Sequence, residues 1–274
     1  MAQDRSAEVL GKLFDVRGAR TLVTGAASGL GLAFAEILAD CGARVTLADI
    51  DAELLAESTA KLADRGLDVR SAVLDVADRD AVQATVDEIV AEQGGLDVAF
   101  ANAGIGTGPG FIVPDGETVD RIDAASFDRA MAINLSGALA TIGAAAGAMK
   151  AGGNGGRIIV TSSIAGLQAE PIVGYAYVAS KAALINVVRQ AALDLAGDGI
   201  LINAICPGPV KNTRIGEGAT FDPTPEAEAE WTGMVPLGRM GVPEELKGLA
   251  LLLASPASSF MTGAAYPVDG GSLL

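Results

Sequence analysis

The sequence predicts an α/β protein with one doubly wound sheet of seven parallel strands and helices on both faces. Short apolar runs of β-forming residues alternate with amphipathic, helix-length segments along most of the 274 residues, which is typical of βαβ units. Half of the residues are hydrophobic but only 4% are aromatic. The core must therefore be built from Ala, Val, Leu and Ile, which suits helices packed closely on a buried parallel sheet.

The expected elements follow one another in order along the chain. Short apolar runs predict strands at residues 21–24, 44–48, 69–74, 98–101, 157–161, 200–205 and 264–268. Amphipathic spacing predicts the helices between them, at about residues 29–41, 51–65, 78–93, 125–150, 174–196 and 243–254. Crossovers of this length join parallel strands. No Pro- or Ser-rich linker divides the chain, so residues 1–274 are expected to form one domain.

Two segments interrupt this alternation, and both follow expected strands. Residues 105–124 are rich in Gly, Pro and Asp, while residues 210–239 contain prolines, several acids and the one tryptophan, Trp231. Ligands of open parallel sheets bind beyond the carboxyl ends of the strands, and long irregular loops there are usually functional. We therefore expect residues 210–239 to form a substrate lid with a short helix, and residues 105–124 to shape the entrance.

Charge and composition exclude several classes of partner and site. The net charge of −15 argues against nucleic acid and anionic membrane surfaces as partners. The chain has no histidine, which excludes a Ser-His-Asp triad and histidine-ligated metal sites, and no metal site is expected. Cys41 and Cys206 have no metal-binding spacing, so we expect reduced thiols in a cytoplasmic protein. Residues 1–18 carry charges and no apolar run reaches 18 residues, so neither a signal peptide nor a membrane span is expected.

A glycine-rich turn follows the first expected strand, in the stretch Thr24-Gly25-Ala26-Ala27-Ser28-Gly29-Leu30-Gly31. Glycines between a strand and a helix permit a tight turn and let backbone N–H groups approach a pyrophosphate at the helix N-terminus. We therefore expect a dinucleotide to contact Gly25, Ser28, Gly29, Leu30 and Gly31.

Asp49 indicates which dinucleotide binds. It ends the second expected strand, 24 residues after Gly25, where a carboxylate accepts hydrogen bonds from adenosine ribose hydroxyls and repels a 2′-phosphate. Neither Ala27 nor the adjacent Ile50 supplies the positive charge that NADP needs, so NAD is favoured over NADP. The structural alternative for Asp49, a helix N-cap, fits Asp51 better.

The next two expected strands supply further cofactor contacts. Asp75-Val76 ends the third strand, where the carboxylate can meet the adenine amino group; an N-cap or turn role for Asp75 is equally compatible with the sequence. Asn102-Ala103-Gly104 ends the fourth, where small residues let a cofactor lie against the backbone.

Tyr177 and Lys181 stand four residues apart in an expected helix, on one helix face. With the motifs above, the chain resembles the short-chain dehydrogenase/reductase family over nearly its whole length. The resemblance implies a single Rossmann-type domain, a nicotinamide cofactor and interconversion of an alcohol and a carbonyl compound. The matching pieces are residues 24–31, Asp49, Asp75, 102–104, Asn134, Ser163, 177–181, Pro207-Gly208 and 268–271.

The resemblance also implies roles for four polar side chains. Tyr177 is expected to exchange a proton with the substrate oxygen. The ordinary pKa of a phenol is about 10, and the positive charge of Lys181 is expected to favour the phenolate form of Tyr177. Lys181 is also expected to bind the nicotinamide ribose. Ser163 is expected to orient the substrate oxygen; Ser162 is the alternative, but Ser163 directly precedes an apolar, a small and a glycine residue. Asn134 is either solvent-facing or holds a carbonyl or water that links Lys181 to solvent.

Further contacts are implied downstream of the sixth expected strand. Pro207, Gly208 and Val210 are expected along the nicotinamide, and a threonine normally follows to bond its carboxamide. Thr213 comes one residue later than the usual spacing, so either Thr213 reaches through a shifted loop or Asn212 replaces it. Tyr175 has no lysine four residues on and is expected to line the substrate cleft with Gln168 and Arg214.

The predicted function is hydride transfer between NAD and a small secondary alcohol or ketone. Two alternatives stay open: a catalytically silent NAD-binding regulator on the same fold, and a 3-oxoacyl carrier-protein reductase. Silent relatives usually lack the Tyr or the Lys, whereas the reductase normally uses NADPH and a basic docking patch, which Asp49 and the net charge disfavour. The resemblance and the apolar helices expected at 125–150 and 174–196 indicate a homotetramer.

Overall fold

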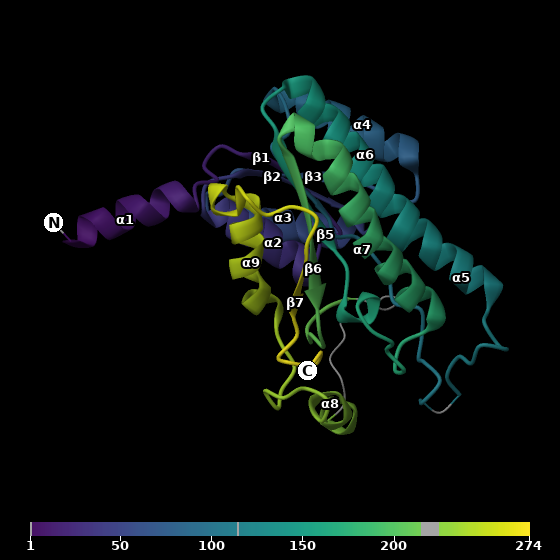
Figure 1. The fold of residues 1–274 in the computed structure, drawn as a ribbon. Helices are drawn as coiled ribbons and strands as arrows, with labels where there is room; N and C mark the ends of the chain where they lie inside the picture. The colour runs from purple at the N-terminus through teal and green to yellow at the C-terminus, as the bar shows by residue number, and fades with distance from the viewer. Residues whose placement is uncertain (1, 114, 215–224) are drawn as a thin grey trace.

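The computed structural model describes residues 2–113, 115–214 and 225–274, and parallel strands form its central sheet (Figure 1). The strand order is β3-β2-β1-β4-β5-β6-β7, so the chain reverses direction across the sheet between β1 and β4, as in doubly wound dinucleotide-binding folds. The predicted fold class is confirmed. The strands are β1 Arg20–Thr24, β2 Arg44–Asp49, β3 Val69–Val73, β4 Val98–Ala101, β5 Gly156–Thr161, β6 Ile200–Pro207 and β7 Ala265–Val268.

Helices cover both faces of this sheet. One layer contains α4 (Arg79–Gln93), α6 (Ala138–Gly152) and α7 (Tyr175–Leu195). The other contains α2 (Gly29–Asp40), α3 (Ala52–Ala63) and α9 (Lys247–Ala254). Each layer packs on the sheet through its own apolar cluster.

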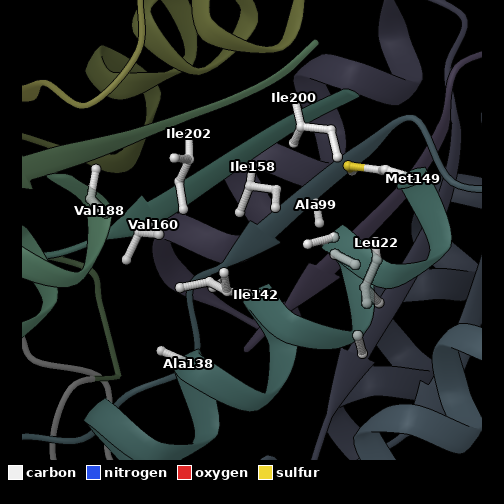
Figure 2. Close-up of a cluster of buried hydrophobic side chains, with 14 of the residues drawn as sticks. Leu22, Ala99, Ala138, Ile142, Met149, Ile158, Val160, Val188, Ile200 and Ile202 are labelled. Atoms are coloured by element: carbon white, nitrogen blue, oxygen red, sulfur yellow. The ribbon is translucent and has the colours of Figure 1, made fainter. Parts of the chain in front are cut away.

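The central strands are buried on both faces. Figure 2 shows the first cluster, in which Ile158 of β5 and Ile202 of β6 lie on the same side of the sheet as Ile142 of α6. The neighbouring residues Ile159 and Ile205 belong to the opposite cluster. Because successive side chains of a strand point to opposite faces, this two-sided burial explains the continuous apolar runs in the sequence.

Two parts of the helical structure differ from expectation. The helix expected at 125–150 consists of α5 (Ala124–Ala130), a π-helical turn (Met131–Gly137) and α6. The sequence analysis missed α1 (Ala2–Leu13), which extends away from the sheet in Figure 1. Its polar and charged composition carries no long apolar pattern, so burial periodicity could not reveal it.

The stretch Ala124–Gly152 is, within the described residues, the helix whose length and composition would allow it to cross a membrane. Half of its apolar window is buried, and α6 contacts α4, β4 and β5. These contacts are those of a core helix in the layer on the sheet.

Candidate active site

A cavity of about 1140 Å³ lies at the carboxyl ends of the strands, where doubly wound sheets bind ligands. It brings together residues that are far apart in the sequence, from the glycine turn, the strand ends and α7. The predicted site residues that line it are Gly25, Ser28, Gly29, Leu30, Gly31, Asp49, Ile50, Asp75, Val76, Asn102, Ala103, Gly104, Ser163, Tyr177, Lys181, Pro207, Gly208, Val210 and Thr213.

The glycine turn between β1 and α2 forms a cradle that side chains would fill. A Cβ on Gly31 would lie 2.1 Å from the carbonyl oxygen of Gly25, and Gly25 itself has a φ of 66°, which favours glycine. Ser28 occupies the N-cap of α2 without a side-chain hydrogen bond to the helix. Its hydroxyl therefore does not compete for the first N–H groups of α2, and the turn fits a dinucleotide pyrophosphate.

Asp49 is fixed at the end of β2 by the backbone. Its carboxylate accepts hydrogen bonds from the N–H groups of Ala27 (3.0 Å) and Asp51 (3.0 Å). Asp51 caps α3 by accepting from Leu54 N (3.1 Å), as the sequence predicted. Arg214 lines the cavity. Its Nη1 lies 3.0 Å from Asp51 Oδ2, so the guanidinium lies at the end of the cavity that holds Asp49, and its contact with a substrate stays a prediction.

Asp75 is a turn residue that also lines the cavity. Its Oδ1 accepts a hydrogen bond from Ala77 N at 2.9 Å, whereas Asp78 caps α4. Across the cavity, Asn102 Nδ2 donates to the carbonyls of Thr24 (3.0 Å) and Gly25 (3.2 Å). Asn102 therefore ties the glycine turn to the end of β4.

Tyr177, Lys181 and Ser163 meet at the wall formed by α7 and the end of β5. Tyr177 is the third residue of α7, and its phenol lies near enough to the Ser163 hydroxyl for that group to lower the phenol's pKa. Lys181 Nζ, one turn on, donates to the carbonyl of Thr161 at 2.9 Å. Ser162 instead donates to the carbonyl of Lys181 at 2.8 Å, so Ser163 is the serine that meets the phenol.

Burial shifts the ionisation of these groups in opposite directions. It raises the pKa of Tyr177 to about 12, partly offset by the hydroxyl of Ser163. It lowers the pKa of Lys181 to about 8 because a charged ammonium loses its hydration. At neutral pH the phenol is therefore a proton donor, and most Lys181 side chains remain cationic. Burial also raises the pKa of Cys206 to about 11.

Comparison with known proteins identifies the family. A family model described as enoyl-(acyl carrier protein) reductase matches residues 25–272. The sorbitol dehydrogenase of Cereibacter sphaeroides is 39% identical over 261 residues, which cover 93% of this chain and 97% of the relative. The chain belongs to the short-chain dehydrogenase/reductase family. It is an enzyme of the short-chain alcohol dehydrogenase class, and such enzymes use nicotinamide cofactors.

Two further similarities span nearly the whole dehydrogenase. The galactitol 2-dehydrogenase of Agrobacterium fabrum is 37% identical over 263 residues, which cover 92% of this chain and 96% of the relative. The crystal structure of a short-chain type dehydrogenase/reductase from Mycobacterium marinum superposes with a TM-score of 0.84 at 36% identity, covering 95% of this chain and 97% of that one.

Asn134 is fully buried in the π-helical turn of the dehydrogenase. Its Oδ1 accepts from Ile105 N at 2.7 Å, and its Nδ2 donates to Ile105 O at 2.9 Å. The solvent-facing alternative is therefore wrong. The side chain lies behind the cavity wall rather than on it, and it fixes the backbone that follows β4.

Of the two alternatives Asn212 and Thr213, Thr213 lines the cavity, and its contact with a carboxamide stays a prediction. Asn212 is exposed and adopts a left-handed conformation with a φ of 60°, which Asn tolerates better than most residues. Thr213 follows this turn, lines the cavity and is buried. Thr213 Cα would lie only 3.3 Å from a Cβ on Gly29.

One of the substrate-side expectations, that for Tyr175, needs correction. Tyr175 does not line the cavity, because it lies at the start of α7, where its backbone N–H is hydrogen-bonded to Glu117 (2.8 Å). Gln168 lines an adjoining pocket of about 140 Å³. The sequence analysis missed Glu170, which lines both spaces and whose pKa is raised by burial. Glu170 is not part of any motif in the sequence that would have indicated its place at the cavity.

The expected lid is described only in part, because residues 215–224 lie outside the described residues. The ends of the segment meet where Val210 and Gly241 form a parallel bridge. The expected short helix is α8 (Pro225–Thr232), near the carboxyl end of β6 (Figure 1). Lys211 Nζ lies 2.9 Å from Glu228 Oε1, and Trp231 lines the cavity. Closure of this segment over a ligand remains a prediction.

Proposed function

We propose that this dehydrogenase interconverts a secondary alcohol and its ketone with NAD, using Tyr177 as the acid and base. The observation that carries the proposal is the meeting of Tyr177, Ser163 and Lys181 at the wall of a cavity that also contains the dinucleotide cradle. When bound, the nicotinamide supplies the hydride acceptor or donor.

The protein's own residues handle the proton. In oxidation Ser163 orients the alcohol oxygen and Tyr177 takes its proton; in reduction the phenol returns a proton to the carbonyl oxygen. Lys181 provides a positive charge 5.5 Å from the centre of the tyrosine ring, which opposes the effect of burial on the phenol. We propose that Asn134, which donates to the carbonyl of Ile105, links Lys181 to solvent so that the proton can return there.

The preference for NAD is proposed from Asp49. Its carboxylate is held by two backbone N–H groups, so it cannot easily turn away from a ribose 2′-phosphate. The nearby cation, Arg214, is engaged with Asp51. A 2′-phosphate would therefore meet a fixed negative charge at this end of the cavity.

For the substrate we propose a polyol, because the relatives include sorbitol and galactitol dehydrogenases and the cavity extends to polar groups. Gln168 and Glu170 line the adjoining pocket with Trp231. An amide and a carboxylate can donate and accept hydrogen bonds with several hydroxyl groups.

The test is NADH formation from a panel of polyols and monohydroxy alcohols, with NAD and NADP compared and Tyr177→Phe as the inactive control. Turnover with NAD and a polyol supports the proposal. A silent regulator would bind NADH without oxidising any member of the panel. A carrier-protein reductase would instead reduce a 3-oxoacyl thioester with NADPH in preference to all of these reactions.

We further propose that the dehydrogenase is a cytoplasmic homotetramer. Leu139 of α6 and Leu193 of α7 are 41% and 80% exposed, and apolar residues on outer helix faces favour helix pairing between subunits. Light scattering in solution measures the mass directly; a monomer would contradict this part.

A further inference from the structure

The helix that carries Tyr177 and Lys181 begins without a capping side chain of its own. Its N-cap is Gly174, which has no side chain that could accept a hydrogen bond from the first turn of the helix. The N–H groups of the first turn of any helix lack partners within that helix. In α7 this turn includes Tyr177, so whatever binds these N–H groups also holds the backbone of the catalytic tyrosine.

The segment of residues 105–124 supplies the missing acceptors. The carboxylate of Glu117 accepts from Tyr175 N at 2.8 Å, and the hydroxyl of Thr107 accepts from Tyr177 N at 3.2 Å. The carbonyl of Gly108 accepts from Gly174 N at 3.1 Å. The negative charge of Glu117 also complements the positive end of the α7 dipole.

This contact requires close approach of two backbones. A Cβ on Gly174 would lie 2.8 Å from Thr107 Oγ1 and 3.1 Å from Glu117 Oε2, so glycine at the N-cap makes room for both. Gly110 N donates to Ile172 O at 2.6 Å, and Glu117 N donates to Pro109 O at 3.0 Å. The segment is therefore folded against the residues that lead into α7.

We propose that Glu117 and Thr107 are positioning residues for Tyr177. They replace the absent N-cap of α7 and thereby set the place of the phenol relative to Ser163. Thr107 lines the cavity but Glu117 does not, so Glu117 acts on the reaction through the helix and not through contact with substrate. The proposal rests on the proposed role of Tyr177 as acid and base.

The experiment compares Glu117→Ala with Glu117→Gln, and Thr107→Val with Thr107→Ser. In each pair the first variant removes the acceptor and the second retains one. Asp78→Ala is the matched control, because it removes the N-cap of α4, a helix that contributes no described residue to the cavity. Amide hydrogen exchange in the first turn of α7, kcat for the alcohol and the Kd of NADH are measured for each protein.

We expect Glu117→Ala and Thr107→Val to speed exchange in the first turn of α7 and to lower kcat by about 10- to 100-fold, the effect of a small misplacement of a reacting group. The Kd of NADH should change less than about threefold. Glu117→Gln and Thr107→Ser should restore most of kcat, and Asp78→Ala should lower thermal stability without this loss.

Three results would overturn the proposal: full kcat in both acceptor-removing variants, failure of both conservative variants to restore activity, or an equal loss of kcat in Asp78→Ala. The exchange measurement needs no turnover. If the wild-type protein oxidises no alcohol, the proposed function fails, while unchanged exchange in Glu117→Ala and Thr107→Val separately rejects the capping role.

Discussion

Lys181 Nζ lies 5.5 Å from the centre of the Tyr177 ring and is held there by a 2.9 Å hydrogen bond to the carbonyl of Thr161. The helix places the two side chains on one face, and the end of β5 determines where the ammonium points. Ser163 follows the same end of β5, and its hydroxyl lies near enough to the phenol to lower the phenol's pKa. The geometry of the phenol therefore depends on contacts between α7 and β5.

Removing the phenol hydroxyl should stop turnover without preventing cofactor binding. We expect Tyr177→Phe to lower kcat by about 10²- to 10⁴-fold, the usual contribution of a positioned acid or base, with a nearly unchanged Kd for NADH. Steady-state kinetics and NADH fluorescence test this. Tyr175→Phe is the control and should stay active, because Tyr175 lies outside the cavity lining. High activity in Tyr177→Phe would remove the tyrosine from the proposed mechanism.

The buried Lys181 should make stability rise with pH. Its pKa falls from 10.5 to about 8 on folding, so between these values the unfolded chain binds more protons than the folded protein, and the unfolding free energy increases with pH. The raised pKa of Tyr177 acts above about pH 10, where it lowers stability as pH rises, and this range lies above pH 9.5. In Lys181→Met this contribution is absent.

Urea unfolding at pH 7.5 and pH 9.5 measures the effect. The stability of the wild type relative to Lys181→Met should be greater at the higher pH by about 2 kcal/mol. Taking the difference between the two proteins cancels groups that titrate equally in both. A difference that does not change with pH would show that Lys181 is not desolvated on folding.

The pH dependence of alcohol oxidation should follow Tyr177. Burial raises its pKa to about 12 in the protein alone, but the positive charge of a bound nicotinamide favours the phenolate, and so does Lys181 while it is protonated. We expect kcat/KM, measured with saturating NAD, to rise through a midpoint below the free phenol's pKa of about 10, and the midpoint to move upward in Lys181→Met. Cys206→Ala should leave the profile unchanged. An unmoved midpoint in Lys181→Met would contradict this assignment.

Cofactor preference should depend on Asp49. The double variant Asp49→Ala/Ile50→Arg removes the fixed negative charge and adds a partner for a 2′-phosphate. We expect the ratio of kcat/KM for NAD to that for NADP to fall by at least about tenfold, and each factor of ten is about 1.4 kcal/mol. Ile50→Gln serves as the control for the loss of the apolar side chain. Full retention of the NAD preference would reject Asp49 as its source.

The glycine cradle should not tolerate a methyl group at Gly31. A Cβ there would lie 2.1 Å from a backbone oxygen of Gly25, so Gly31→Ala should lower the thermal midpoint and weaken NADH binding. Gly143→Ala is the control, because Gly143 is exposed on α6 and no atom lies within 4 Å of its Cβ position. This variant should leave the unfolding free energy unchanged or raise it by up to about 1 kcal/mol. Equal behaviour of the two variants would show that the turn can open without cost.

Local patterns and the family resemblance were sufficient to predict the parallel sheet and many of the residues that line the cavity. The glycine turn, Asp49 and Asn102 each directly follow an apolar strand, and neighbouring parallel strands present their carboxyl ends at one edge. Their spatial meeting therefore follows from sequence periodicity. The pairing of Tyr177 with Lys181 follows in the same way from the geometry of one helix.

Other features depend on contacts between segments that are far apart in the chain. Asn134 points inward because it pairs with the backbone of Ile105, and Thr213 lines the cavity directly after the left-handed turn at Asn212. Arg214 is drawn to Asp51, 163 residues away, and Glu117 caps the start of α7. A hydrogen bond between distant segments joins polar groups that only folding brings together. The spacing of residues in the sequence therefore does not predict it.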